Sequence, residues 1–253
     1  MASHGVPRLN PAEESSAEAR QEEQRKIEAY LELERLVHAK IREHEYTPET
    51  LQKISELLNR NPEYYTIWNY RRRILARQFS LAVSGDSDQP AADHIAATIK
   101  ADLEFIFPLL RKFPKCYWIW NHRSWLLEEA RRLLPAPVAR RFWQEELALV
   151  GKMLSVDGRN FHGWGYRRFV VGALENFAPE KSMAQEELDY TTKMIKTNLS
   201  NFSAWHYRTK LIQKLLNEKP ASDDERRKTL DDGKDTFSGR LCDANVSNFF
   251  FQN

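Results

Sequence analysis

The sequence predicts an all-α protein, an α-α superhelix (solenoid) of helical hairpin repeats. Three observations predict it. Four times a Trp is followed three residues later by an Arg, apolar residues around each pair recur at helical spacing, and alternating strands joined by Asn-Gly or Asp-Gly turns are absent. The pairs are Trp68/Arg71, Trp120/Arg123, Trp164/Arg167 and Trp205/Arg208. Such columns are typical of stacked arrays, in which each unit buries its apolar side against a neighbour.

The segment before the first pair predicts an arm followed by a helix. Residues 1–16 are polar and lack the apolar stretch of a signal peptide, so we expect a flexible arm. Over residues 17–45 the charges are dense, but apolar residues return at helical spacing, which predicts a charged amphipathic helix. Thr47, Pro48 and Glu49 then supply an N-cap, a first-turn proline and an early acid. They predict the start of the first repeat helix.

Each repeat is predicted to fold as helix, turn, helix. Ahead of each Trp, apolar residues at offsets of three, four and seven share one side of a helix. These first helices cover residues 51–58, 103–110, 147–154 and 188–195. An aromatic residue three before the Trp and an apolar pair after it predict a second helix with its own stripe, over residues 65–75, 117–127, 161–171 and 202–212. The segments between hold Asn, Pro, Gly or Asp and predict turns.

Composition excludes several function classes. The 253 residues include 38 Lys and Arg against 36 Asp and Glu, so no broad basic excess points to nucleic acid. Cys116 and Cys242 form no disulfide framework, which favours a reducing compartment. No apolar run approaches the roughly 20 residues that span a bilayer. A Gly-rich phosphate loop, a Ser nucleophile elbow and metal-spaced cysteine pairs are missing. We therefore expect a soluble, cytoplasmic protein without a self-contained active site.

Two basic residues occupy the same place in neighbouring predicted turns. Lys115 precedes its Trp by five residues, and Arg159 precedes its own Trp by five. Stacked units would hold them side by side, where Lys offers a compact charge and Arg a bidentate fork to a phosphate or diphosphate. Spacing alone leaves a second interpretation open, that of two solvated turn residues. The repeated Trp and Arg columns we assign to packing, because a residue present in every unit usually supports the stack.

Four stretches resemble the repeat of protein prenyltransferase α-subunits. They read NRNPEYYTIWNYRRRIL, RKFPKCYWIWNHRSWLL, VDGRNFHGWGYRRFVV and NLSNFSAWHYRTKLI. Within that family the chain is most similar to the Rab geranylgeranyltransferase (type II) branch, because Phe161 stands where farnesyltransferase-type α-subunits usually carry Tyr. The resemblance covers about residues 17–230, which we expect to form the helical-repeat domain.

The resemblance implies a division of labour between two chains. The helices would form a crescent around a separate β-subunit, an α/α barrel that holds the catalytic zinc and most of the isoprenoid pocket. Lys115 and Arg159 fall on positions that the family uses to contact the diphosphate of geranylgeranyl diphosphate. The isoprenoid would pass to C-terminal cysteines of a Rab GTPase presented by an escort protein. His4 belongs to an N-terminal His-Gly pair that, in Rab-type α-subunits, can reach the β-subunit zinc.

Two other functions stay open at this point. One is the α-subunit of a farnesyltransferase or of the type I geranylgeranyltransferase. The other is a non-enzymatic helical-repeat scaffold, which the Trp spacing opposes because it exceeds the 34 residues or so of a tetratricopeptide unit.

The repeat also stops before the chain does. Residues 231–253 carry no helical stripe, and we interpret them as an atypical tail from a truncated or misread end, such as a retained intron or a frameshift.

Overall fold

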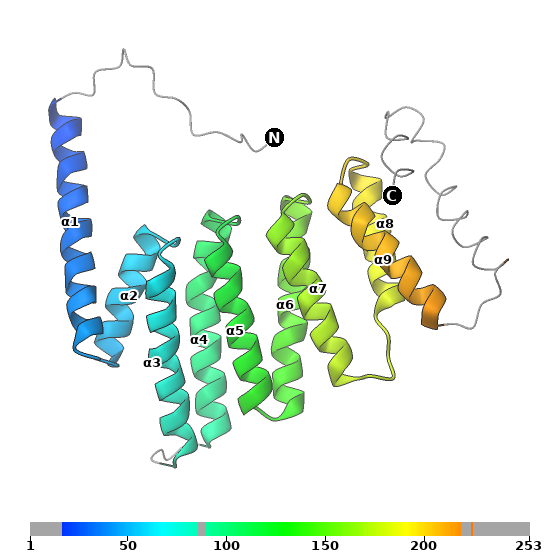
Figure 1. Ribbon diagram of the computed structural model, residues 1–253, viewed down its shortest axis with the longest axis horizontal. Coiled ribbons are helices and arrows are strands. Elements are labelled where there is room, and N and C mark those ends of the chain that lie inside the picture. The colour runs from blue at the N-terminus through cyan, green and yellow to red at the C-terminus, as the bar shows by residue number, and fades with distance from the viewer. Residues whose placement is uncertain (1–16, 86–89, 219–223, 225–253) are drawn as a thin grey trace. The chain divides into compact units, whose positions relative to one another are not determined.

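The regular secondary structure of the described residues is helical. The computed structural model describes residues 17–85, 90–218 and 224, and the regular secondary structure in these ranges is α-helical throughout (Figure 1). The predicted all-α superhelix of hairpins is thereby confirmed. The arm at residues 1–16, which includes His4, and the tail at residues 231–253 lie outside the described residues.

The chain divides into two compact units, and the described residues of the first form three helices before α4. The unit Met1–Ala91 contains α1 (Ala17–Arg42), α2 (Pro48–Arg60) and α3 (Tyr65–Val83). The predicted charged helix is confirmed as α1, which packs on α2, and α2 in turn packs on α3. The predicted start of the first repeat helix is also confirmed, because the Thr47 side chain accepts the backbone N–H of Thr50 at 3.2 Å.

A polar cluster ties α1 to the turn between α2 and α3. Asn61 Nδ2 donates to the Tyr30 hydroxyl at 3.1 Å, and the Tyr64 hydroxyl donates to Glu34 at 2.9 Å. His38 Nε2 lies 2.7 Å from the same Tyr64 hydroxyl. Burial and the hydrogen bond to Glu34 raise the pKa of Tyr64 to about 12. The first turn is therefore anchored by side chains on one side of α1.

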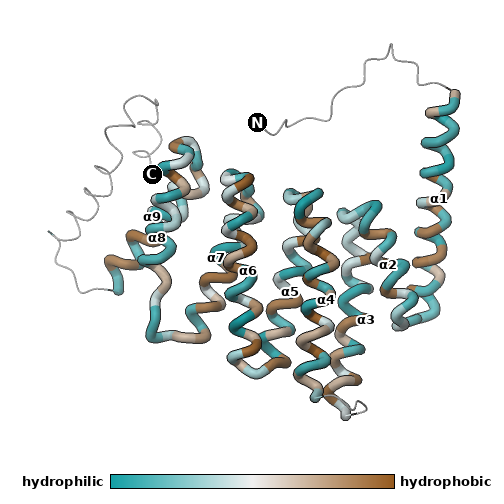
Figure 2. Tube along the Cα trace, turned by 180° about the vertical axis from the view of Figure 1, so that it is seen from behind, coloured by the Kyte–Doolittle hydropathy of each residue, from teal (hydrophilic) through white to brown (hydrophobic). Residues whose placement is uncertain are grey.

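The second unit holds three consecutive hairpins. The unit Ala92–Asn253 contains nearly all of α4 and the five helices that follow it in the described residues. They are α4 (Ala91–Lys112), α5 (Tyr117–Leu133), α6 (Ala136–Val156), α7 (Phe161–Phe177), α8 (Ala184–Thr197) and α9 (Phe202–Glu218). Helix α5 packs on α6 and α7, α6 on α7, α7 on α9, and α8 on α9. Each hairpin of the second unit thus packs on the next, and hydrophobic and hydrophilic residues alternate along its helices (Figure 2).

The repeated Trp side chains close the turns of their own hairpins. All four are at most 8% exposed. Each indole Nε1 donates, at 2.8 to 2.9 Å, to the backbone carbonyl six residues earlier, that of Pro62, Pro114, Gly158 or Leu199. A buried Trp needs such an acceptor for its N–H. The packing role predicted for the Trp column is confirmed, and the hydrogen bond explains why the Trp stands at a constant distance from the turn.

The aromatic column three residues before the Trp behaves differently from the predicted stripe. Its members are the first residues of their helices and remain 49% to 73% exposed; they are Tyr65, Tyr117, Phe161 and Phe202. A first residue stands at the open end of its helix, where no further helical turn covers it. The buried stripe begins with the Trp instead, and a row of aromatic side chains stays at the turns.

Two of the repeated Arg residues, Arg123 and Arg167, pair with acidic residues of the next hairpin. Arg123 on α5 donates through Nε to Glu146 on α6 at 3.0 Å and also pairs with it through Nη2. The Tyr166 hydroxyl donates to the same carboxylate at 2.6 Å. Arg167 on α7 likewise donates to Glu187 on α8, at 2.8 and 2.5 Å. These two members of the Arg column join neighbouring hairpins, and all four members are buried, which confirms the predicted packing role.

Burial shifts the titration of the Arg123 cluster. Burial acts to lower the pKa of Arg123, but the charges of Glu146 and Tyr166 and the hydrogen bonds to them together outweigh it and raise that pKa above its ordinary value. Burial, followed by the charge of Glu146, holds the pKa of Tyr166 well above its usual range. Arg123 therefore stays charged and Tyr166 stays neutral across the physiological pH range.

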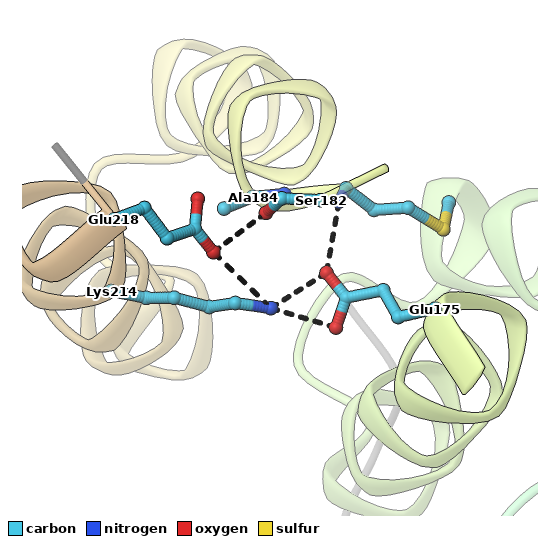
Figure 3. A network of polar contacts seen from close by, with 6 residues as sticks. Glu175, Ser182, Ala184, Lys214 and Glu218 are labelled. Carbon is cyan, nitrogen blue, oxygen red and sulfur yellow. Dashed lines mark hydrogen bonds and ion pairs between the residues drawn. The ribbon is translucent and has the colours of Figure 1, made fainter. Parts of the chain in front are cut away.

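A surface network fixes the connection between α7 and α8 against α9 (Figure 3). Lys214 Nζ on α9 donates to both carboxylate oxygens of Glu175 on α7, at 2.6 and 2.7 Å. Glu175 also accepts the backbone N–H of Met183 at 2.8 Å. The Ser182 hydroxyl donates to Glu218 at 2.8 Å. The start of α8 is thus held from two neighbouring helices.

None of the helices in the described ranges is long and apolar enough to cross a membrane.

Candidate functional site

Both predicted cations lie in turns and are exposed. Lys115 is in the turn between α4 and α5, and Arg159 is in the turn between α6 and α7, so their predicted placement in turns is confirmed. The equivalent positions in the other two hairpins hold Glu63 and Ser200. Two of the four turns therefore offer a cation at this position.

Asn160 joins the two turns that carry the cations. Its Nδ2 donates to the carbonyl of Pro114 at 2.9 Å, and its Oδ1 accepts the backbone N–H of Gly163 at 3.0 Å, which caps α7. Pro114 directly precedes Lys115, and Asn160 directly follows Arg159. One side chain therefore brings the backbone of one cationic turn into hydrogen-bond contact with the other. The two predicted site residues lie in neighbouring, directly linked turns.

The same arrangement recurs one hairpin later. Asn201 Nδ2 donates to the Gly158 carbonyl at 2.7 Å, and its Oδ1 accepts the backbone N–H of Ala204 at 3.1 Å. A Cβ on Gly158 would stand 3.3 Å from Asn201 Nδ2, closer than most such contacts, so the glycine permits the close approach. The three turns of the second unit form a row, called here the turn row: residues 113–116, 157–160 and 198–201.

The two asparagines were not among the site residues predicted from the sequence. Both stand four residues before a repeat Trp, and each is followed three residues later by a small residue whose backbone N–H it accepts. This is an N-cap signal that the alignment of the repeats contained. The link to the preceding hairpin was not readable in the same way, because the donor and the acceptor are more than 40 residues apart in the sequence.

Aromatic side chains accompany the cations. The rings of Tyr117, at the start of α5, and His162, at the start of α7, have centroids 6.1 Å apart. Phe161 packs on His162 with a centroid distance of 6.0 Å and is itself 73% exposed. Sequence analysis did not connect Tyr117 with His162, because the two occupy different columns of the repeat. The contact confirms that the starts of α5 and α7 lie side by side.

The turn row is suited to an anion. Lys115 and Arg159 each stand two residues before a helix begins, α5 and α7 respectively, and the free N–H groups at helix starts carry partial positive charge. The Asp157 carboxylate accepts the backbone N–H of Arg159 at 3.3 Å, which shapes the turn. Among the described residues no group of three or more His, Cys, Asp or Glu side chains could hold a metal ion. The arrangement can neutralise developing negative charge, but its described residues offer no set of metal ligands.

Known proteins with the same repeat support this assignment of elements. Residues 48–78, 99–130, 143–174 and 184–215 match the protein prenyltransferase alpha subunit repeat. Each match spans one predicted hairpin. The solved structure of Candida albicans protein geranylgeranyltransferase-I complexed with GGPP is similar with a TM-score of 0.62 and 25% sequence identity, over 85% of this chain and 62% of that one.

Curated relatives agree with the repeat match. The geranylgeranyl transferase type-2 subunit alpha of Candida albicans is 44% identical over 172 residues, which are 68% of this chain and 44% of the relative. Its counterparts from Saccharomyces cerevisiae and Homo sapiens are 40% and 36% identical, over 68% and 66% of this chain and 48% and 27% of their own lengths. The chain thus spans less than half the length of these relatives. By its four repeats and these relatives, the chain belongs to the protein prenyltransferase alpha subunit family.

Proposed function

We propose that the chain is the α-subunit of a heterodimeric Rab geranylgeranyltransferase, the type II enzyme. In this role it supports a catalytic β-subunit in the cytoplasm and lends Lys115 and Arg159 to the diphosphate of geranylgeranyl diphosphate. The acceptors are C-terminal cysteines of a Rab GTPase presented by an escort protein. The observation that carries the proposal is the hydrogen bond from Asn160 to Pro114, which joins two cationic turns in a chain whose relatives are type-2 alpha subunits.

Transfer of the isoprenoid from its diphosphate is helped by positive charges held in fixed positions. The leaving diphosphate gains negative charge as the bond from its oxygen to the isoprenoid carbon breaks, so cations held in place stabilise the transition state more than the bound substrate. Lys115 supplies a compact charge, and Arg159 supplies a planar fork that binds two oxygens. Asn160 acts as a positioning residue, since it holds both turns without carrying charge.

The partner chain supplies the remaining parts of the proposed enzyme. The isoprenoid pocket and the zinc belong to the β-subunit, and that zinc would activate the Rab cysteine thiol. No step is assigned to a metal on this chain, because its described residues offer no set of ligands for one. The crescent around the β-subunit and a contact from His4 to the zinc stay predictions, and His4 lies outside the described residues.

A type I enzyme is the second candidate. It is favoured by the similarity to the Candida albicans protein geranylgeranyltransferase-I structure. The acceptor separates the two candidates. A type II enzyme modifies a Rab protein in the presence of its escort protein, whereas a type I enzyme modifies a short peptide that ends in a C-terminal cysteine motif.

Reconstitution tests the proposal. The chain is co-expressed with a type II β-subunit, the complex is isolated by size-exclusion chromatography, and transfer from geranylgeranyl diphosphate to a Rab–escort complex is measured. We expect no activity from the chain alone and clear turnover from the complex. If the chain forms no complex with type I or type II β-subunits, the subunit role is overturned.

The double variant Lys115→Ala plus Arg159→Ala tests the diphosphate role. We expect kcat to fall on the order of 100-fold, the scale for loss of transition-state charge stabilisation, while the complex still forms. The matched control is Lys193→Ala plus Lys196→Ala, two exposed lysines of α8 outside the turn row. Normal turnover by the first double variant would defeat the role given to Lys115 and Arg159.

A further inference from the structure

A groove outside the turn row opens between α6, α7 and α8. Its volume is about 460 Å³, within the range of small-molecule sites. Apolar side chains of each wall line it, among them Leu147 of α6, Leu174 of α7 and Met183 at the start of α8. Neither Lys115 nor Arg159 lines this groove, so the proposed prenyl-transfer role leaves it unexplained.

In the first and fourth hairpins, the repeated Arg has a hydrogen-bond acceptor for Nη1. In the first hairpin, Arg71 Nη1 donates to the Ser55 hydroxyl at 2.8 Å. In the fourth, Arg208 Nη1 donates to the Thr192 hydroxyl at 2.5 Å. Both hydroxyl residues stand thirteen positions before the repeat Trp. Each of these Arg residues therefore finds an acceptor for Nη1 on the first helix of its own hairpin.

The third hairpin has Gly151 at the corresponding position. A Cβ there would lie 3.5 Å from Arg167 Nη1, so the glycine leaves open the place that a hydroxyl takes in the first and fourth hairpins. Nε and Nη2 of Arg167 are both committed to Glu187. Within the described ranges Nη1 has no acceptor, and both Gly151 and Arg167 line the groove. The groove thus contains a hydrogen-bond donor next to an open space.

Arg167 is held rigidly in this position. Its guanidinium carbon lies 3.4 Å from the centroid of the Tyr190 ring, on which the group stacks. The ion pair with Glu187 fixes the plane of the guanidinium. The hydrogen bond from the Met183 N–H to Glu175 holds the start of α8, where Met183 lines the groove. Binding an acceptor at Nη1 would therefore require little reordering of the protein.

The charges at the groove favour an anion. Glu187 forms an ion pair with Arg167, and Glu186 Oε1 forms one with Lys181 Nζ at 3.2 Å. Arg140 is exposed, lines the groove and has no ion-pair partner in the described part of the chain. It stands eleven residues before Gly151 on α6, or about 16 Å along the helix. Arg167 and Lys181 are balanced by these acids, so Arg140 supplies the positive charge that attracts an anion to the groove, and Arg167 Nη1 supplies a hydrogen-bond donor within it.

We propose that this groove binds a medium-chain aliphatic carboxylate, with a carboxylate oxygen accepting from Arg167 Nη1 in the space beside Gly151. The alkyl chain lies along Leu147, Leu174 and Met183, and a chain of about six to ten carbons suits the volume. A peptide fits less well, because the backbone groups of α6 and α8 are satisfied within their helices and leave a peptide's amides few partners.

Calorimetric titration of the full chain with octanoate tests the proposal. We expect saturable binding with one site per chain. Acetate, which lacks the alkyl chain, and octylamine, which carries the opposite charge, should not saturate under the same conditions. Octanoate binding that does not saturate, or that octylamine reproduces, is non-specific and overturns the proposal.

Two variants locate the site. Gly151→Ser places a hydroxyl where the first hairpin has one, and we expect it to weaken octanoate binding at least tenfold. The matched control is Lys152→Ser, the same change on an exposed neighbour that does not line the groove, which should leave the affinity unchanged. Arg140→Gln, on an exposed residue, should weaken binding about threefold without affecting folding. Unchanged affinity in both Gly151→Ser and Arg140→Gln overturns the proposal. Melting temperatures show that each variant is folded.

Discussion

The second unit carries two sets of basic residues in opposite environments. Arg123 and Arg167 are 2% and 6% exposed, and each pairs with a buried acid of the next hairpin. Lys115 and Arg159 stand eight residues earlier in the same hairpins, where the turns leave them exposed. The buried column has a member in all four repeats, whereas the turn column is cationic in two of them. The position within the hairpin thus separates charges that hold the stack together from charges that can meet a ligand.

The largest expected effect comes from the buried set. Glu146→Ala leaves the Arg123 charge buried without its acid and removes the acceptor of the Tyr166 hydroxyl. We expect the free energy of unfolding to fall by about 3 to 5 kcal/mol, measured by urea denaturation. Glu145→Ala, on an exposed neighbour, is the control and should change it by less than about 0.5 kcal/mol. Equal losses for the two variants would contradict the structural role of the buried pair.

A smaller loss of stability is expected for variants of Asn160, which directly follows the exposed Arg159 and is itself buried. Asn160→Ala removes both the cap on α7 and the bond to Pro114, and we expect a loss of about 1 to 2 kcal/mol in urea denaturation. Asn160→Asp keeps an acceptor for the Gly163 N–H but loses the donor to Pro114. It should therefore lose less stability, yet slow prenyl transfer if the link aligns the two cations. If the Asp variant matches the wild type in both measurements, the link between the turns has no such role.

The turn of the first hairpin should respond to alkaline pH. The pKa of Tyr64 is raised to about 12 by burial and Glu34, whereas an unfolded Tyr titrates near 10. The folded chain then holds this proton more tightly than the unfolded chain, so its contribution to stability is complete below pH 10 and is lost as the pH rises through 12. Because Tyr64 is partly exposed, we expect this contribution to the free energy of unfolding to be less than about 1 kcal/mol.

The comparison that reveals this contribution is between the wild type and Tyr64→Phe. Urea denaturation at pH 9 and pH 11.5 should show a steeper loss of stability in the wild type than in the variant. Parallel losses would mean that the Tyr64 hydroxyl does not titrate differently in the folded state.

The smallest effect is expected for the exposed cations themselves. Lys115→Ala plus Arg159→Ala should change the free energy of unfolding by less than about 0.5 kcal/mol for each residue, because both side chains are exposed. Thermal or urea unfolding of the isolated chain measures this. A loss as large as that of Glu146→Ala would show that the turn cations hold the stack, and the contrast between the two sets would disappear.

The helices were predictable because their signals are local. The apolar spacing before and after each Trp lies within a single helix, so residues 147–154 and 161–171 were correctly assigned to two helices around a turn, now α6 and α7. The aromatic column was misjudged, because periodicity does not report that Phe161 stands at the open end of its helix. Lys115 and Arg159 were placed correctly in turns, but their function stays a proposal.

The sequence by itself determined the helical hairpins, the turns and the family, because each depends on residue spacing within one repeat. Only the tertiary structure decided that Asn160 reaches Pro114, that Tyr117 meets His162, and that Gly151 leaves Arg167 Nη1 open to a groove. These features depend on which side chains meet when hairpins stack. The pattern of a single repeat predicts that stacking occurs, but contacts between residues far apart in the chain are set only by the packed geometry.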